Sequence, residues 1–332
     1  MAEHGAGHSS ASQSSASKPS ASKPSASKSG TARRGRRPSI GLALGSGSAR
    51  GWAHIGVIQE LEALGIRPDI VAGTSIGALV GGVYVAGQLD AFEEWVTRLT
   101  FRDVIGFLDI SFSGGFVKGE KLFSFFSEQH LNPGIEELTQ RFATVATDMQ
   151  LGREVWIQDG PVLDAARASC ALPGLFSPVK HDDRWMLDGG LVNPVPVSVC
   201  RALGADLVIA VNLNGQLIGR HLSHDDNLVD DMGESVSAEE RSMWGKMVDY
   251  FSSAEDANAT PGFFDVIGAS VNIMQDRITR SRMAGEPAEL TLIPMLEDFA
   301  IMDFHRAGDA IEEGRRLVRA NAERIEWLMG RV

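Results

Sequence analysis

A serine between two glycines is the first group in this sequence that could act as a nucleophile. Ser75 lies in the Gly-x-Ser-x-Gly motif that runs from Gly73 to Gly77, directly after the apolar run 70–72. Between a strand and a helix, this motif forms a turn so sharp that its flanks must be nearly free of side chains, and the serine oxygen is exposed at the tip. The helix N-terminus behind the turn offers N–H groups and a partial positive charge to an oxyanion. The alternative is an ordinary serine in a glycine-rich turn.

A second glycine-rich loop, residues 45–51, lies between a predicted strand at 39–44 and a predicted helix at 52–64. A dinucleotide-binding loop needs glycine where this chain has Arg50, and an acidic residue where the second strand ends in Ala72 and Gly73. We therefore favour an oxyanion hole, because small residues leave backbone N–H groups open to a carbonyl oxygen. Arg50 either steadies this loop, binds an anionic head group or is simply solvated.

Asp188 is the best candidate for the base that accepts the proton of Ser75. It ends a predicted strand and is followed by Gly189 and Gly190, so its carboxylate can approach another loop without steric conflict. Direct proton transfer needs a hydrogen bond of about 2.6–3.2 Å and a carboxyl pKa that burial has raised above its usual value near 4. The alternative is a common Asp-Gly-Gly turn.

The histidines fit a catalytic triad less well. None of the six outside the N-terminal tail follows a strand in a tight turn, where the histidine of an α/β-hydrolase lies. The six are His54, His130, His181, His221, His224 and His305. His54 falls one turn into the first helix, where we expect a structural role.

The order of the predicted elements indicates an α/β fold with a parallel sheet. Strands are predicted at 39–44, 70–72, 142–147, 154–158, 185–188, 207–211 and 290–293. Helices are predicted at 52–64, after Ser75, at 89–99, 161–169, up to 203, at 263–283 and at 303–329. The strand at 207–211 is apolar throughout, which predicts a central place in the sheet.

Three segments in this order resemble the patatin-like phospholipase family, and its bacterial RssA branch in particular. They are residues 45–51, 73–77 and 188–190. Further matches lie at 51–57, at 167–173 with Phe176 and Pro178, and at 303–306, so the resemblance covers about residues 39–310. It implies a three-layer α/β/α fold with a central, mostly parallel sheet.

The resemblance also implies a Ser–Asp dyad, with Ser75 as the nucleophile and Asp188 as the base. The implied oxyanion hole is formed by backbone N–H groups of Gly45, Gly47 and Ser48. The implied supporting residues are Arg50, Gly73, Gly77, Gly189 and Gly190. Many members have an unbroken glycine run where this chain has Ser46 and Ser48, which reduces the freedom of the loop to adopt positive φ.

The expected function is therefore a serine acyl hydrolase of the lipase, phospholipase A or lysophospholipase type, which cleaves a lipid or acyl ester through an acyl-enzyme. No metal and no cofactor are expected. The alternative is a catalytically weak regulatory or partner-binding protein with the same fold. Acyl length, head group and oligomeric state are left open by the sequence.

Composition favours a cytoplasmic protein that touches the inner face of the membrane only transiently. There are two cysteines, Cys170 and Cys200, and we expect both to be small buried residues in a reducing compartment. No apolar run approaches the roughly 18 residues of a membrane span, and the N-terminus lacks the pattern of a signal peptide. The net charge of the whole chain is −12, and residues 1–40 carry +6, so the rest of the chain carries −18. Such an acidic body argues against nucleic-acid binding.

The chain divides into a tail and one domain. Residues 1–37 are a low-complexity basic segment with repeats of Ser-Ala-Ser-Lys, too poor in apolar residues to fold, and we expect a disordered tail. Its basic cluster either touches membrane or nucleic acid or is simply solvated. Residues 38–332 form the acyl hydrolase domain, with an irregular acidic insertion at 214–258. The Phe- and Gly-rich stretch 101–126 is either core or the cover of an apolar pocket, and we expect membrane contact there.

Overall fold

The computed structural model describes residues 37–107, 123, 132–173, 176–216 and 263–330. The expected tail, most of the insertion at 214–258 and most of the stretch 101–126 lie outside these residues. Of the last stretch, the described part begins with a helix, α4 (Phe101–Phe107).

The centre of the molecule is an eight-stranded sheet. Five strands are parallel to one another, in the spatial order β3 (Arg141–Asp148), β2 (Ile70–Thr74), β1 (Ile40–Leu44), β7 (Leu207–Val211) and β8 (Leu290–Leu292). Three more are added by antiparallel pairing at the β3 side: β4 (Glu154–Ile157), β5 (Val179–His181) and β6 (Arg184–Asp188). The sheet is therefore mostly parallel, and β7 lies inside it as its apolar sequence predicts.

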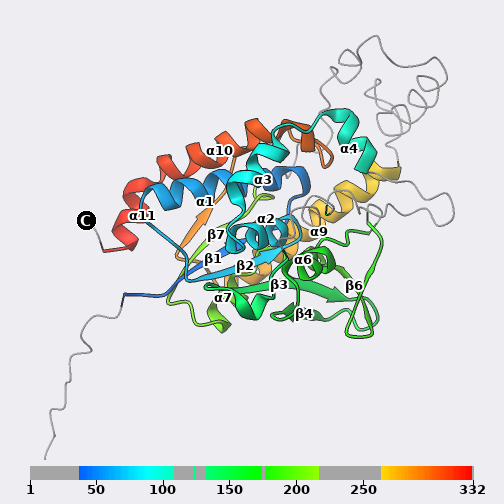
Figure 1. Ribbon diagram of the computed structural model, residues 1–332, viewed down its shortest axis with the longest axis horizontal. Coiled ribbons are helices and arrows are strands. Elements are labelled where there is room, and N and C mark those ends of the chain that lie inside the picture. Colours follow the sequence, from blue (N-terminus) through cyan, green and yellow to red (C-terminus); the bar gives the residue numbers. More distant parts are fainter. Residues whose placement is uncertain (1–36, 108–122, 124–131, 174–175, 217–262, 331–332) are drawn as a thin grey trace, which may run out of the picture. The chain divides into compact units, whose positions relative to one another are not determined.

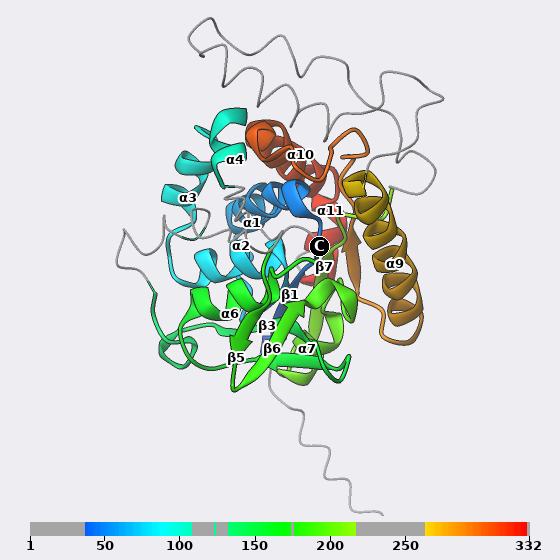
Figure 2. The same ribbon diagram turned by 90° about the vertical axis from the view of Figure 1, so that its right-hand side faces the viewer.

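Helices cover both faces of this sheet. Alternate residues of β1 point to opposite sides: Leu42 and Leu44 lie in one apolar cluster and Ala43 in another. The first cluster holds residues of α1 (Ala53–Ala63), α2 (Ile76–Val85), α3 (Leu89–Val96), α6 (Val162–Ser169) and α10 (Ala307–Ala320). The second holds residues of α7 (Val197–Ala202) and the end of α9 (Phe263–Gly285). These are the three α/β/α layers that the family resemblance implies (Figures 1 and 2).

The prediction of one continuous helix over residues 303–329 is wrong. It consists of a 3-10 turn (Phe304–Arg306), α10 and α11 (Ala322–Leu328). Asn321 separates the two α-helices, and its Nδ2 donates to the carbonyl oxygen of Leu317 at 2.9 Å. An asparagine side chain that bonds to nearby backbone competes with the helix ladder and favours such a break.

The short strand β5 is not predicted from the sequence. It pairs with β6 across a turn whose central residues, Asp182 and Asp183, both have positive φ. Two such residues form the tight hairpin turn that matches the twist of the strands, although Asp is less usual there than Asn-Gly.

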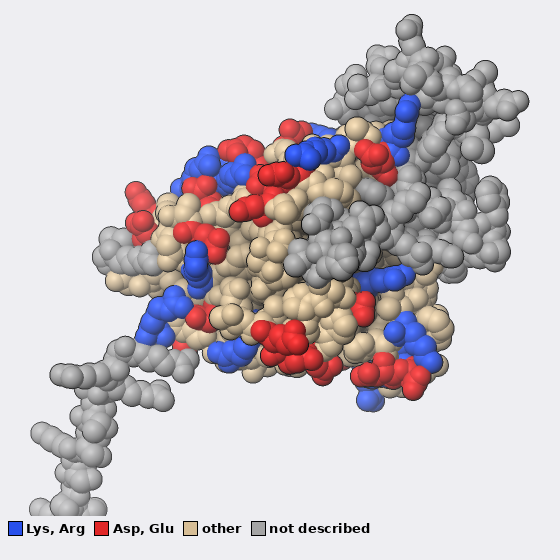
Figure 3. Space-filling view, in the orientation of Figure 1, with Lys and Arg blue, Asp and Glu red and all other residues tan. Residues whose placement is uncertain are grey.

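Charges of both signs are mixed on the surface. On the face shown in Figure 3, Lys and Arg side chains are interspersed with Asp and Glu. Several of them form ion pairs along α10, among them Arg315 with Glu93 and Arg319 with Glu60. Within the described part of the chain, every helix is too short or too polar to cross a bilayer.

Candidate active site

Ser75 lies at the tip of the turn between β2 and α2. Its backbone is in the left-handed region, with φ 56° and ψ −127°. Gly77 is required because a Cβ there would come within 2.2 Å of the carbonyl oxygen of Leu44, and one on Gly73 would come within 2.4 Å of the Cα of Ala78. The two glycines therefore allow α2 to start directly against the ends of β1 and β2, as the motif predicts.

The turn is also held from below by α6. The N–H of Ser75 donates to Oγ of Ser169 at 2.8 Å, and this hydroxyl in turn donates to the carbonyl oxygen of Val145 on β3. Ser169 is fully buried. The backbone of Ser75 is thus fixed to the neighbouring strand through one side chain.

Asp188 reaches Ser75 because β2 and β6 end at the same point of β3. The last residue of β2, Thr74, pairs with Val145, and the last residue of β6, Asp188, pairs with Ala146, the next residue of β3. Because β4 occupies the opposite edge of β3 there, β2 and β6 must share one edge. One strand is parallel and the other antiparallel to β3, so their carboxyl ends meet head to head.

The two side chains are hydrogen-bonded. Oγ of Ser75 donates to Oδ2 of Asp188 at 2.5 Å, and the N–H of Gly190 donates to Oδ1 at 2.7 Å. Asp188 has no exposed surface, and this burial raises its pKa to about 6, although both hydrogen bonds act in the opposite direction. At neutral pH the group is therefore an ionised carboxylate with a stronger proton affinity than an ordinary aspartate.

The described histidines lie elsewhere. Nε2 of His54 donates to the carbonyl oxygen of Gly45 at 2.8 Å, and burial lowers the pKa of His54 to about 4, so the ring is neutral and supports the loop. The hydroxyl of Ser75 donates to Asp188, and no hydrogen bond joins it to His181 or His305 within the described residues. His130, His221 and His224 lie outside the described residues.

The oxyanion donors expected from the sequence are brought together only in part. The N–H of Gly45 donates to the carbonyl oxygen of Val211 at 3.0 Å, and that of Ser46 donates to Pro194 at 2.9 Å. Gly45 is therefore wrong as a donor, because its amide continues the pairing of β1 with β7. Within the described residues the amides of Gly47 and Ser48 have no such acceptor, and both residues line the same cleft as Ser75.

Arg50 is buried and is part of the site. Its Nε donates to the carbonyl oxygen of Gly47 at 3.1 Å and its Nη2 to Oδ1 of Asn272 at 3.2 Å. Burial lowers its pKa to about 10, partly offset by the charge of Asp303, so the guanidinium stays protonated at neutral pH. Arg50 thus steadies the loop and also places a positive charge beside the cleft, and it is not a solvated side chain.

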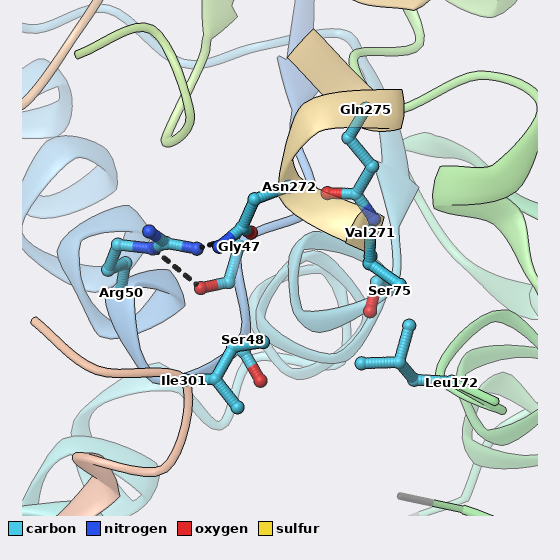
Figure 4. A pocket seen from close by; sticks show the side chains of 9 residues that line it. All are labelled: Gly47, Ser48, Arg50, Ser75, Leu172, Val271, Asn272, Gln275 and Ile301. Atoms are coloured by element: carbon cyan, nitrogen blue, oxygen red, sulfur yellow. Dashed lines mark hydrogen bonds between the residues drawn. The ribbon is translucent and has the colours of Figure 1, made fainter. Parts of the chain in front are cut away.

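Ser75 lies in a small cleft, whose open space amounts to about 240 Å³ when the solvent at its mouth is included (Figure 4). It is lined by Gly47, Ser48, Arg50, Ser75, Leu172, Val271, Asn272, Gln275 and Ile301. Three of these residues, Val271, Asn272 and Gln275, come from one face of α9.

Some of the residues around Ser75 and Asp188 are not found by sequence reasoning. Ser169 falls in the segment 167–173 that carries the family resemblance, but nothing local marks its hydroxyl. Asn272 and Gln275 are polar residues of an amphipathic helix about 200 positions after Ser75, without a motif. Cys170 is buried as expected, and its pKa is raised by this burial and by the nearby Asp188.

Comparison with known proteins assigns the chain to a family. The family model for patatin-like phospholipase matches residues 42–201, which include the Gly45–Gly51 loop, Ser75 and Asp188. An uncharacterized NTE family protein of Mycobacterium tuberculosis is 34% identical over 333 residues, covering 87% of this chain and 92% of its own. Lysophospholipase nte1 of Emericella nidulans is 29% identical over 300 residues, 85% of this chain but only 18% of the fungal protein.

Among solved structures, the crystal structure of VipD from Legionella pneumophila overlaps 87% of this chain and 77% of its own, at 12% identity and a TM-score of 0.33. Both the mycobacterial and the fungal relative carry the NTE name. The RssA branch suggested by the sequence motifs is a minor detail within the same family. With the three-layer fold and the family match together, the chain belongs to the patatin-like phospholipase family.

Proposed function

We propose that this protein is a serine acyl hydrolase of lipid esters that works through a dyad of Ser75 and Asp188. The observation that carries the proposal is the 2.5 Å hydrogen bond from Ser75 to a fully buried carboxylate whose pKa is raised to about 6. A base with a pKa near the operating pH is the most effective proton acceptor that a carboxylate can provide.

The reaction has two halves. Oγ of Ser75 attacks the acyl carbon while Asp188 accepts its proton, and the amides of Gly47 and Ser48 hold the oxyanion. The C–O bond to the alcohol then breaks, Asp188 returns the proton to that oxygen, and an acyl-enzyme remains. In the second half a water attacks the acyl carbon while Asp188 accepts its proton. The bond between the acyl carbon and Oγ then breaks, Asp188 returns the proton to Oγ of Ser75, and the fatty acid is released.

A lysophospholipid is the substrate class that we favour. The fungal relatives are named lysophospholipases. Leu172, Val271 and Ile301 give the cleft an apolar part for an acyl chain, beside the polar group formed by Arg50, Asn272 and Gln275. We further propose a cytoplasmic location with transient membrane contact.

Hydrolysis of p-nitrophenyl esters by purified variants tests the proposed function. Ser75→Ala and Asp188→Asn should each lower kcat/KM by about 10³ or more, since each removes a group of the dyad. Two matched controls, Ser270→Ala on the exposed side of α9 and Asp90→Asn on α3, should stay within about twofold of wild type. Circular dichroism verifies that each variant is folded.

Full activity in either dyad variant would refute the mechanism. The regulatory alternative makes the opposite prediction, which is that wild type itself has no activity above that of Ser75→Ala. A panel of lysophospholipids, phospholipids and neutral esters then identifies the preferred class.

A further inference from the structure

Gln275 is held in one orientation by two hydrogen bonds to its oxygen. Oε1 accepts from Oγ of Ser46 at 2.9 Å and from Nδ2 of Asn214 at 2.8 Å, and all three side chains are at least 96% buried. The first bond ties α9 to the oxyanion loop, and the bond between Asn272 and Arg50 ties it there a second time. The amide of Gln275 therefore cannot rotate without losing two buried bonds.

The nitrogen of this amide, Nε2, is the group that faces the cleft. Among the described residues none accepts a hydrogen bond from Nε2, although the side chain is 4% exposed and lines the cleft at Ser75. Nε2 is not one of the enclosed side-chain atoms that lack a partner, and a donor on the wall of a cleft can bond a polar group that enters it.

Gly190 explains how Nε2 comes to lie beside the dyad. A Cβ on Gly190 would be 2.3 Å from Nε2 of Gln275 and 2.9 Å from Oδ1 of Asp188, so the missing side chain leaves the space into which the amide projects. Gly190 thus lets Gln275 of α9 lie close to Asp188. Gly189 is needed for a different contact, because a Cβ there would come within 2.1 Å of the carbonyl oxygen of Val145.

Polar and apolar side chains both line the cleft around Ser75. In Figure 4, Asn272 and Gln275 of α9 lie above Ser75 together with Val271, and Arg50 lies on the left. Ile301 and Leu172 lie below, beside Ser48. An ester whose acyl chain lies on the apolar side presents its alcohol portion to the amides and the guanidinium. Hydrogen-bond donors and a buried positive charge suit an anionic group rich in oxygen.

We propose that Gln275 is a substrate-binding residue that recognises the glycerophosphate head group of a lysophospholipid, with Nε2 as the donor and Arg50 as the nearby positive charge. This inference rests on the proposed function and adds the residue that selects the head group. Asn214 and Ser46 act as positioning residues, because their side chains donate to Oε1 of Gln275.

Binding to the Ser75→Ala protein tests this without any turnover. The two probes are 1-O-octyl-glycero-3-phosphocholine and 1-O-octylglycerol, which share a chain and are used below their critical micelle concentrations. We expect the phosphocholine ether to bind at least tenfold more tightly than the glycerol ether, a difference of about 1.4 kcal/mol. Gln275→Met should remove most of this preference. Gln275→Glu, which keeps an acceptor for Ser46 and Asn214, should remove it fully because a carboxylate repels phosphate.

The control is Met274→Gln, a change at an exposed neighbour on the same helix, which should keep the tenfold preference. An unchanged preference in both Gln275 variants, an equal loss of affinity for both ethers, or no preference in the parent would each overturn the inference. Displacement of the phosphocholine ether by millimolar inorganic phosphate would also overturn it, since the site would then take free phosphate. If wild type hydrolyses no ester but the preference depends on Gln275, the proposed function fails and the head-group site stands.

Discussion

Two serines in this site have backbones that favour glycine. Ser75 has φ 56° and Ser48 has φ 53°, both in the left-handed region. For a residue with a Cβ this conformation costs about 1–2 kcal/mol. At Ser75 the strained turn exposes the hydroxyl of the proposed nucleophile, whereas at Ser48 only the backbone N–H is needed by the proposed oxyanion hole. Ser46, in the same loop, has no positive φ and uses its hydroxyl to hold Gln275.

Replacing these loop serines by glycine should therefore have opposite effects on stability. Ser48→Gly should raise the free energy of unfolding by about 1 kcal/mol through relief of strain. Ser46→Gly should lower it by about 1 kcal/mol or more, because the buried bond to Gln275 is lost. Urea unfolding of both variants measures the difference, and a Ser48→Gly protein less stable than Ser46→Gly would contradict the account of the loop.

At the level of elements, the site depends on three segments that meet at β3. Strands β2 and β6 end at neighbouring residues of β3, and α6 supplies Ser169 to fix the turn. The serine hydroxyl of Ser169 serves the N–H of Ser75 and the carbonyl oxygen of Val145 together. Its removal leaves both buried groups without that partner.

Ser169→Ala should lower the free energy of unfolding by about 1–3 kcal/mol, the usual effect of leaving buried polar groups unpaired. It should also lower kcat by about tenfold with little change in KM, because the turn that carries Ser75 is less well fixed. Steady-state kinetics and urea unfolding, with Ser270→Ala as the exposed control, measure both effects. A stability equal to that of the control would rule out the bridging role.

Local pattern was enough to predict the turn at Ser75 and the strand that ends in Asp188, because each is specified by a few adjacent residues. Contacts between distant segments were not predictable. Ser169 lies 94 positions from Ser75, and Gln275 lies 229 positions from Ser46, and no local signal marks either residue. The assignment of Gly45 as an oxyanion donor fails for the same reason, since its amide donates to Val211 of β7, over 160 residues away.

For the whole molecule, the site has an electrostatic cost. The pKa of Asp188 rises from 3.8 to about 6 on burial, so the folded protein holds this proton more tightly than the unfolded chain. Below about pH 4 Asp188 is protonated in both states and has no such effect. As the pH rises from about 4 to about 6, ionising the buried group lowers the free energy of unfolding, and above about pH 6 the loss is complete. The contribution of His54 to stability changes with pH in the opposite direction. Burial lowers its pKa to about 4 and favours the neutral ring, so this contribution increases as the pH rises.

Asp188→Asn should therefore stabilise the protein at pH 7 by about 2–3 kcal/mol, the value of a shift of roughly two pKa units. The gain should shrink as the pH falls and vanish near pH 4, while the contribution of His54 cancels in the comparison with wild type. Thermal unfolding of both proteins from pH 4 to pH 8 measures it. A stabilisation that is independent of pH would mean that the carboxylate carries no such penalty.

The central claim is that Asp188 activates Ser75, and the rate of fluorophosphonate labelling of Ser75 as a function of pH tests it most directly. For wild type the second-order rate constant should rise about tenfold per pH unit below pH 6 and level off above it, following ionisation of Asp188. In Asp188→Asn it should fall by about 10²–10⁴ and lose this midpoint. A midpoint near pH 6 that persists in Asp188→Asn, or labelling of that variant at the wild-type rate, would contradict the dyad.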